Sequence, residues 1–354
     1  MPPHSFTFNF DSLLTTTWMN YREKLYDNIF NAVPFFHWIY ASGRKRIEDG
    51  GESIVVPLEY GRNSTIKSME TGYDTIDTTP QDPFTSAKYD WREVAGSTSI
   101  SNKELAKNQG KGKIIRLLES LANNTEMSFT EIIEAMIIGA MSWGNGGADI
   151  QPLSTLVAKD PTASTEIGGI NQNTYAWWRN QYKQSAATTY EGLIREIANL
   201  YNKCSKGGKK GKRSYPDMGI CDQNFYETYE GACRAKGQMI IPMNEKIADM
   251  GFGGIKYRGT TLMWDEFYPD IETGTGVTPD TVDTYSYSYC GLTFLNSEFL
   301  EFVICKGQDF VVGPFIQPEN QKVKTSLLYL MGELCCSNRR KQGVLFKVPT
   351  TIIA

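Results

Sequence analysis

The apolar residues between positions 114 and 136 recur with the period of an α-helix, and the length of this pattern constrains the fold more than any other feature. The residues on one face are Ile114, Leu118, Leu121, Phe129, Ile132 and Met136, with Thr125 in the single gap. Glycines lie at both ends of the pattern. A helix from Gly112 to Gly139 would be roughly 40 Å long, whereas a typical helix has about 11 residues. We therefore expect a long helix whose apolar stripe is covered by a sheet or a neighbour.

The segment before this helix predicts a long hairpin with almost no core of its own. Strands are expected at Glu52–Tyr60 and Lys88–Ala95, and the residues between them are mostly Gly, Asn, Thr, Asp and Pro. A structureless loop of this length is uncommon in a compact domain. We therefore expect a projecting arm with distal strands at Ser64–Met69 and Tyr73–Thr78. Because an isolated hairpin is marginal in water, the arm should rest on another chain; an ordinary surface hairpin is the alternative.

The run Phe35–Tyr40 has no obvious cover in the sequence around it. Five of its six side chains are aromatic or aliphatic, which makes the run too apolar to stand in water alone. It is either tucked into the core of its own chain or held against a neighbouring one, and both interpretations stay open at this point.

A glycine-rich basic segment follows the predicted second helix. Its cations are Lys203, Lys206, Lys209, Lys210, Lys212 and Arg213. They could contact the phosphates of DNA or a guest protein, or they could belong to a flexible solvated loop. We favour the solvated loop, because the chain as a whole has a net charge of −4 and gives no general attraction to nucleic acid.

The second half of the chain predicts short strands and a second long helix. The helix spans about Thr189–Cys204 and buries Leu193, Ile197, Leu200 and Tyr201. Strands are expected at Pro216–Cys221, Gly291–Asn296, Leu300–Ile304, Phe310–Phe315, Val323–Cys336 and Gly343–Val348, with a further pair turning at Gly259. This order of elements is typical of an α+β protein.

Composition and motifs exclude several classes of function. The 354 residues contain no apolar run of about 20 residues, so no membrane span is expected, and the first residues do not resemble a signal peptide. Seven irregularly spaced cysteines argue against a disulfide framework and favour a reducing cytoplasm. The only histidines are His4 and His37, no cysteine pair has zinc spacing, and Gly-x-Ser-x-Gly is absent. We therefore expect no metal site, no cofactor and no catalytic role.

Colinear segments along nearly the whole chain resemble the major capsid proteins of tailed bacteriophages. They are Asp49-Gly-Gly-Glu-Ser-Ile-Val-Val-Pro-Leu58, Asn63-Ser-Thr65, Gly72-Tyr-Asp-Thr-Ile-Asp-Thr-Thr-Pro80, Tyr89-Asp-Trp91, Trp177-Trp-Arg-Asn180, Tyr226-Glu-Thr-Tyr-Glu-Gly231, Phe315-Ile-Gln-Pro-Glu-Asn320 and Cys336-Ser-Asn-Arg-Arg-Lys-Gln-Gly-Val344. The last segment is the most distinctive. The segments 206–215 and 272–287 look longer than expected in relatives.

The resemblance implies the α+β capsid fold of the Hong Kong 97 type. It divides the chain into an N-terminal arm (1–48), an extended β-hairpin loop (49–100), a peripheral domain with a spine helix (101–145), an axial domain (146–304), returning peripheral strands (305–337) and a C-terminal strand of the axial domain (338–354). The implied intersubunit contact residues are Tyr60, Lys67, Tyr73, Phe84, Tyr89, Trp91, Phe35, Phe36 and Trp38. Some relatives crosslink a loop lysine to a neighbour's asparagine; Lys67 is placed to attempt this, but no partner is assigned.

The implied function is a virion shell of hexamers and pentamers that encloses double-stranded DNA. The implied partners are the chain itself, a separate scaffolding protein, a portal protein at one vertex and a decoration protein, with assembly in the host bacterial cytoplasm and no membrane. One alternative is the shell of a bacterial nanocompartment, which loads an enzyme instead of DNA. An alternative of another class, a carbohydrate-active or carbohydrate-binding protein, rests only on the 19 Tyr, 17 Phe and 7 Trp.

Overall fold

The computed structural model describes residues 33–107, 117–139, 149–209, 212–235, 255–268, 289–349 and 352. The predicted N-terminal arm is therefore described only from residue 33. The start of the predicted long helix and the segment 272–287 lie outside the described residues.

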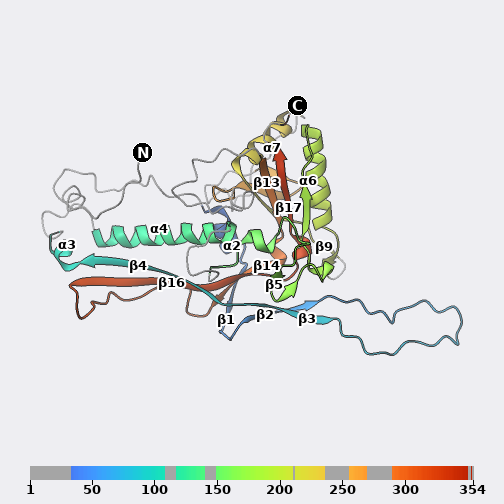
Figure 1. The fold of residues 1–354 in the computed structure, drawn as a ribbon, viewed down its shortest axis with the longest axis horizontal. Coiled ribbons are helices and arrows are strands. Elements are labelled where there is room, and N and C mark those ends of the chain that lie inside the picture. Colours follow the sequence, from blue (N-terminus) through green and yellow to red (C-terminus); the bar gives the residue numbers. More distant parts are fainter. Residues whose placement is uncertain are drawn as a thin grey trace.

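The described strands form two main sheets that share one hydrophobic core (Figure 1). The five-stranded sheet has the order β1 (Lys45–Glu48), β14 (Leu300–Cys305), β16 (Val323–Cys336) and β15 (Val311–Val312), with β4 (Arg92–Ser101) also paired to β16. The six-stranded sheet has the order β11 (Ile255–Tyr257), β12 (Thr260–Trp264), β10 (Met218–Cys221), β13 (Tyr289–Leu295), β17 (Gly343–Pro349) and β7 (Gln181–Gln184). The prediction of α+β architecture is confirmed.

Strand β16 is the longest strand and has the bounds that the sequence predicts. It pairs antiparallel with β4 from Ser101 to Arg92 and with β14 from Leu300 to Ile304. Strand β15 is shorter than the predicted strand Phe310–Phe315. Strand β14 belongs to the five-stranded sheet although the predicted axial segment ran to residue 304, so the chain changes sheet between β13 and β14.

Helix α4 (Leu117–Ile138) lies along the five-stranded sheet and confirms the predicted helix over its described residues (Figure 1). Phe129, Ile133 and Ile137 are buried on the core side. Gly96 of β4 lets the helix approach closely, because a Cβ atom there would lie 3.3 Å from the Phe129 ring. Thr125, the one polar residue in the apolar stripe, makes a polar contact with the sheet: its Oγ1 accepts a hydrogen bond from the Thr98 hydroxyl over 2.8 Å.

Helix α2 (Pro34–Ala41) decides between the two interpretations of the apolar run Phe35–Tyr40. Phe35, Phe36 and Trp38 are buried in the main core of their own chain, and the Phe36 ring packs edge-on against Phe302 and Phe310. The premise that this run has no cover within the chain is wrong, because the ends of α4 and of the five-stranded sheet cover it.

The predicted arm forms only at its base. Strand β2 (Ile54–Glu59) pairs antiparallel with β3 (Phe84–Tyr89), from Ile54 opposite Tyr89 to Glu59 opposite Phe84. The predicted distal strands Ser64–Met69 and Tyr73–Thr78 are wrong, because residues 60–83 contain turns and no strand. The predicted strand Lys88–Ala95 is also wrong, since the chain leaves the hairpin at Asp90-Trp91 and begins β4 in another sheet.

The six-stranded sheet carries a second core beneath two helices, α6 (Tyr190–Cys204) and α7 (Gln223–Ala235). The Thr189 side chain caps α6 by accepting from the backbone N–H of Gly192, and the predicted buried face of α6 is confirmed. The remaining elements are α3 (Asn102–Lys107), α5 (Leu153–Leu156), β5 (Glu166–Ile167), β6 (Ile170–Asn171), β8 (Gly208–Lys209), β9 (Lys212–Arg213), η2 (Ala176–Trp178), η4 (Ser297–Phe299) and η5 (Arg339–Lys341).

Candidate assembly surface

The extended loop, residues 60–83, projects beyond the β2–β3 hairpin and away from the body of the molecule (Figure 1). None of its residues is buried. Its turns are made by side chains that bond to nearby backbone: Asn63 accepts from Thr65 N, Asp77 from Thr79 N, and Asp74 from Glu70 N and Thr71 N. Such local hydrogen bonds compete with a β-ladder, which explains why the predicted distal strands do not form.

The loop carries large apolar side chains that its own chain leaves exposed. Tyr73 is 97% exposed, Ile66 82% and Ile76 63%, and Phe84 at the end of the hairpin is 67% exposed. Tyr60 and Lys67 are also exposed. Apolar side chains gathered on a projecting segment are typical of an interaction surface. Of the nine predicted contact residues, Lys67, Tyr73 and Phe84 are therefore exposed on this segment.

The root of the loop is fixed to the body by aromatic and backbone contacts. The Tyr60 ring stacks on Trp177 with centroids 5.4 Å apart, and Tyr60 N donates to Pro83 O over 2.9 Å. Lys88 N donates to Gly168 O, where φ is +61° and a Cβ atom would lie 2.9 Å from that of Ala87. Only glycine allows this approach, so the hairpin leaves the body in a defined direction.

Two further predicted contact residues take part in this anchoring. The Tyr89 side chain is buried and its hydroxyl donates to the backbone oxygen of Cys336 over 2.9 Å. Trp91 is half-buried and its Nε1 donates to Gly51 O over 2.9 Å. With Phe35, Phe36 and Trp38 in the core, four of the nine predicted contact residues are buried in their own chain, and Trp91 is half-buried.

A buried pair of carboxyl groups joins α4 to the start of α2 and the end of β12. Glu134 is fully buried and accepts from Phe35 N at 2.7 Å and Phe36 N at 2.8 Å. Burial raises the pKa of Glu134 well above its ordinary value, and the adjacent Asp265 raises it further. Burial also raises the pKa of Asp265 to about 6. Burial and the neighbouring carboxyl group thus favour the protonated form of Glu134 in this pair.

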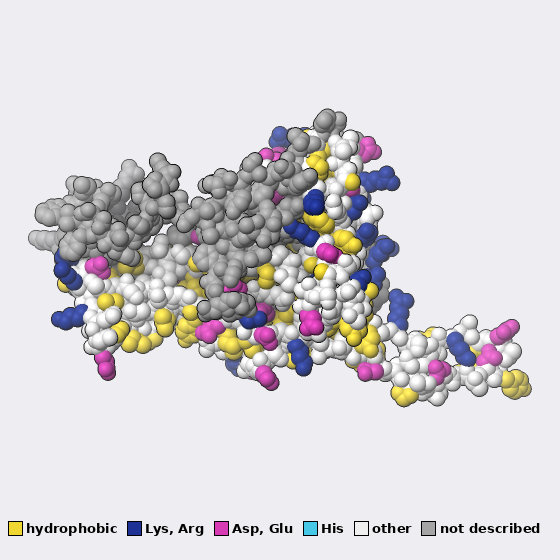
Figure 2. Space-filling model, in the orientation of Figure 1, with side chains coloured by type: hydrophobic (Ala, Val, Ile, Leu, Met, Phe, Trp, Pro, Cys, Tyr) yellow, Lys and Arg dark blue, Asp and Glu magenta, His cyan; other side chains and the backbone are white. Residues whose placement is uncertain are grey.

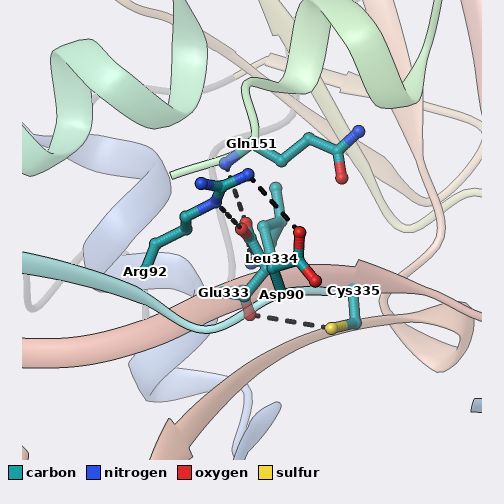
Figure 3. Close-up of polar contacts among 6 residues, drawn as sticks. All are labelled: Asp90, Arg92, Gln151, Glu333, Leu334 and Cys335. Carbon is teal, nitrogen blue, oxygen red and sulfur yellow. Dashed lines mark hydrogen bonds and ion pairs between the residues drawn. The ribbon is translucent and has the colours of Figure 1, made fainter. Parts of the chain in front are cut away.

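A second buried carboxyl group lies on β16 beside β4 (Figure 3). Oε1 of Glu333 accepts from the backbone N–H groups of Gln151 and Leu334, each over 2.8 Å, and the Arg92 guanidinium lies 3.6 Å from Oε2. Arg92 also lies 3.9 Å from the Asp90 carboxylate. Despite this cation, burial raises the pKa of Glu333 to about 8.

The segment 339–342, between β16 and β17, bonds to several distant segments of the chain through buried polar side chains. The Arg339 guanidinium is fully buried and donates to the backbone oxygens of Leu156, Trp178 and Thr155 and to the side-chain oxygens of Gln172 and Asn180. Gln342 bonds both backbone groups of Asn296, and Lys341 donates to Gly207 O. Arg340 alone of these four side chains is exposed.

Sequence reasoning missed these buried polar groups, although it singled out the segment that contains three of them, Arg339, Lys341 and Gln342. Glu134 lies between Ile133 and Ile137 on the buried side of α4, so a carboxylate inside an apolar stripe was the available signal. Nothing in the sequence distinguishes Arg339 from Arg340, because their burial depends on how distant segments pack.

The basic segment is a short hairpin, β8 paired with β9, that follows α6. Lys203 lies in the last turn of α6, and Lys206 and Arg213 are exposed. Lys209 and Lys212 are in the two strands, and Lys210 lies outside the described residues. Lys203 also lines a groove of about 540 Å³ together with Trp177, Arg179, Tyr182 and Arg340.

The part of the chain that the structure describes holds no group of three or more His, Cys, Asp or Glu side chains placed to bind a metal ion. Six of its cysteines, Cys204, Cys221, Cys233, Cys305, Cys335 and Cys336, are free thiols. None of the described helices has both the length and the apolar character needed to cross a membrane.

Neither a protein-family model nor a curated protein sequence matches this chain. Solved structures do. The capsid of cyanophage A-1(L) is 11% identical, with 92% of this chain and 95% of that chain covered and a TM-score of 0.66. The capsid of Myoviridae phage XM1 is 12% identical, with 93% and 97% covered and a TM-score of 0.56.

An encapsulin shares the same architecture. The holo-SrpI encapsulin complex from Synechococcus elongatus is 12% identical, with 94% of this chain and 98% of that chain covered and a TM-score of 0.53. At these identities the likeness speaks for the fold alone, but it extends over more than nine-tenths of each chain. The long helix along one sheet, the second sheet with its helices, and the projecting loop are thus parts of one known architecture: this chain has the Hong Kong 97-type capsid fold.

Proposed function

We propose that this chain is the major capsid protein of a tailed bacteriophage, which assembles as hexamers and pentamers into an icosahedral shell around double-stranded DNA. The observation that carries the proposal is the extended loop, a projecting segment with exposed apolar side chains on a body of capsid fold. A segment that buries no side chain within its own chain can be stabilised by burial only against a second chain.

The mechanism is geometric. The loop of each copy lies over a neighbouring copy and buries Ile66, Tyr73 and Ile76 there. Because the same fold is repeated, closed symmetry satisfies every loop and every receiving surface at once. The stacked Tyr60 and Trp177 rings and the β5–β6 turn at Gly168 set the direction in which the loop leaves the body, and this direction determines which neighbour it reaches.

The proposal includes the partners and the place that the resemblance implies. The shell forms in the cytoplasm of the host bacterium on a separate scaffolding protein, takes a portal protein at one vertex, and becomes the outer layer of the virion, where a decoration protein can bind. These partners are inferred from the capsid fold.

A bacterial nanocompartment shell is the second candidate, and the encapsulin comparison favours it specifically. The same chain geometry would serve, with a protein cargo in place of DNA. The carbohydrate alternative loses its support, since Trp178, Phe225, Phe267, Tyr268, Phe294 and Phe302 are fully buried and serve as core.

Electron microscopy of the purified full-length chain, expressed with and without its neighbouring genes, tests the proposal. Closed shells with fivefold vertices are expected, and nuclease-protected double-stranded DNA should be recovered from filled shells. Shells that contain a folded enzyme and no DNA would favour the nanocompartment. A monomer that stays monomeric at high concentration, with a scaffolding protein present, would contradict both candidates.

We propose that the basic segment is solvated and does not hold the DNA. We expect that neutralising Lys203, Lys206, Lys209, Lys210, Lys212 and Arg213 leaves the packaged genome length unchanged, because confinement rather than tight contact holds the DNA. Quantifying DNA per particle checks this expectation, and shorter or leaking genomes in otherwise intact shells would contradict it.

A further inference from the structure

The groove beside the root of the extended loop is lined by cations that no carboxylate of the described chain neutralises in an ion pair. Arg179, Lys203 and Arg340 come from three separate elements and meet at this groove of about 540 Å³. None of the three forms a salt bridge among the described residues. Asp160, next to the lining residues Pro161 and Thr162, has a pKa that is lowered mainly by its hydrogen bonds to Thr162 and slightly by the charge of Arg179.

The floor of the groove is rigid. Arg179 donates through Nε to Gln172 O over 2.7 Å and through a second nitrogen to Asn173 O. Directly behind it, Arg339 holds Trp178 O and the Asn180 side chain in place. The Arg179 guanidinium is therefore pre-organised, which lowers the entropy cost of binding a ligand there.

The distal half of the extended loop has the complementary charge. Between Ser68 and Asp82 there are four acids, Glu70, Asp74, Asp77 and Asp82, and no lysine or arginine. Hydrogen bonds from Thr71 and Thr79 lower the pKa values of Asp74 and Asp77, which keeps both charged. Figure 2 shows acidic side chains near the tip of the loop and Lys and Arg side chains along the edge of the body next to α6.

The loop cannot reach the groove of its own chain, because its root lies at that groove and its tip points away (Figure 1). Residues 61–83 form two limbs that can span at most roughly 40 Å, enough to cross to an adjacent copy. We propose that the acidic distal half of the extended loop docks into the Arg179–Lys203–Arg340 groove of a neighbouring copy. This inference rests on the proposed shell function and adds the receiving site.

In this arrangement the loop tip of one copy also contacts the base of the loop of the next copy. The receiving groove includes Trp177, on which the receiving chain's own Tyr60 stacks. A bound loop tip therefore supports the root of the next loop, and exposed Tyr182 offers apolar contact to the aromatic tip residue Tyr73.

Charge reversal on each side, followed by combination, tests the proposal in the full-length chain. The loop variant is Glu70→Lys with Thr75→Lys, which reverses or adds charge but keeps the turn-forming Asp74 and Asp77. The groove variant is Lys203→Glu with Arg340→Glu; neither side chain makes a hydrogen bond that the described fold depends on. The matched control is Lys322→Glu with Lys324→Glu, at the start of β16.

We expect each reversal alone to lower the yield of closed shells about tenfold, because like charges then face each other in the contact. The two reversals together should restore the yield to within about threefold of the unmodified chain, and the control pair should leave it unchanged. Circular dichroism of the unassembled chains should be the same for all variants.

Unchanged assembly in both single-side variants, or a combination no better than its parts, would overturn the docking while leaving the shell function intact. A groove variant that builds normal shells but packages less DNA would also overturn it and make nucleic acid the ligand. Failure of the unmodified chain to assemble would instead refute the proposed function on which the inference rests.

Discussion

The extended loop and the C-terminal half of α4 are held in place by different kinds of contact. No residue from 60 to 83 is buried, whereas every residue from 133 to 138 is. The turns of the loop are shaped by hydrogen bonds between residues two to four positions apart, such as Asn63 to Thr65 and Asp74 to Glu70, and its two limbs are joined near the root by Tyr60 and Ser64. The end of α4 is held by residues up to 100 positions away, such as Phe35 and Phe36 on Glu134.

Folding and assembly therefore depend on different segments of this chain. Contacts around α4 are long-range and buried, so they determine the stability of the subunit. The loop contributes little to that stability, and its exposed apolar and acidic side chains remain for a partner. Substitutions in the two regions should therefore change different observables, and the four predictions below run from the largest effect on subunit stability to the smallest.

Replacing Arg339 with methionine should have the largest effect. The guanidinium donates to five oxygens in a dry site, and burial lowers its pKa to about 10. Removing it leaves buried acceptors without donors, so the free energy of unfolding should fall by about 4 kcal/mol. Urea unfolding measures the change. Arg340→Met is the matched control on an exposed neighbour and should change stability by less than about 0.5 kcal/mol.

Phe129→Ala should cost about 3 kcal/mol, because the ring packs against Gly96 and Phe310 and the truncation leaves a cavity. Met127→Ala on the same helix removes a side chain that is 41% exposed and should cost under about 1 kcal/mol. Equal losses from the two substitutions would show that α4 is not packed against the sheet in the register described.

Glu333→Gln should alter the pH dependence of stability. Burial raises the folded-state pKa of Glu333 to about 8, so the neutral form is favoured on folding. The stability that this provides is complete below the unfolded pKa, near 4.3, and is lost as the pH rises through 8. Glutamine cannot ionise, so the variant does not lose this stability. Its free energy of unfolding, relative to that of the unmodified chain, should rise by on the order of 2 kcal/mol between pH 5 and pH 8. Thermal unfolding of unassembled subunits across this range gives the difference, and a gain that shrinks with rising pH would contradict the assignment.

Tyr73→Ala and Ile76→Ala should change subunit stability least, by less than about 0.5 kcal/mol each, because both side chains are mostly exposed. Shell yield, measured by sedimentation, should nevertheless fall. Normal yield from the double variant would place the intersubunit contact elsewhere on the molecule.

The elements that could be predicted from the sequence are those with a long apolar pattern, because such a pattern shows which face of the element is buried. Strand β16 and helix α6 have long apolar patterns, and their bounds agree with the prediction to within one residue. The period of α4 was readable from Leu121 onward for the same reason. In each case local propensity and tertiary burial favour the same structure.

The errors occur where short-range and long-range contacts compete. Residues 64–78 have strand-like composition in part, but the side chains of Asn63, Asp74 and Asp77 capture the backbone locally. The break at Asp90-Trp91 exists because β3 and β4 join different sheets, which no local pattern specifies. The burial of Phe35 and Tyr89, and the meeting of Arg179, Lys203 and Arg340, likewise depend on segments distant in sequence.

The most direct test replaces Gly61–Pro83 with Asn-Gly, which leaves a short connection between β2 and β3, and measures folding and assembly on the same sample. The truncated chain should keep its circular-dichroism spectrum and its melting temperature to within a few degrees, since no buried residue is removed. Electron microscopy should show no stable closed shells, because each subunit has lost its contact with a neighbour. Normal shells from the truncated chain, or a chain that no longer folds, would contradict the account.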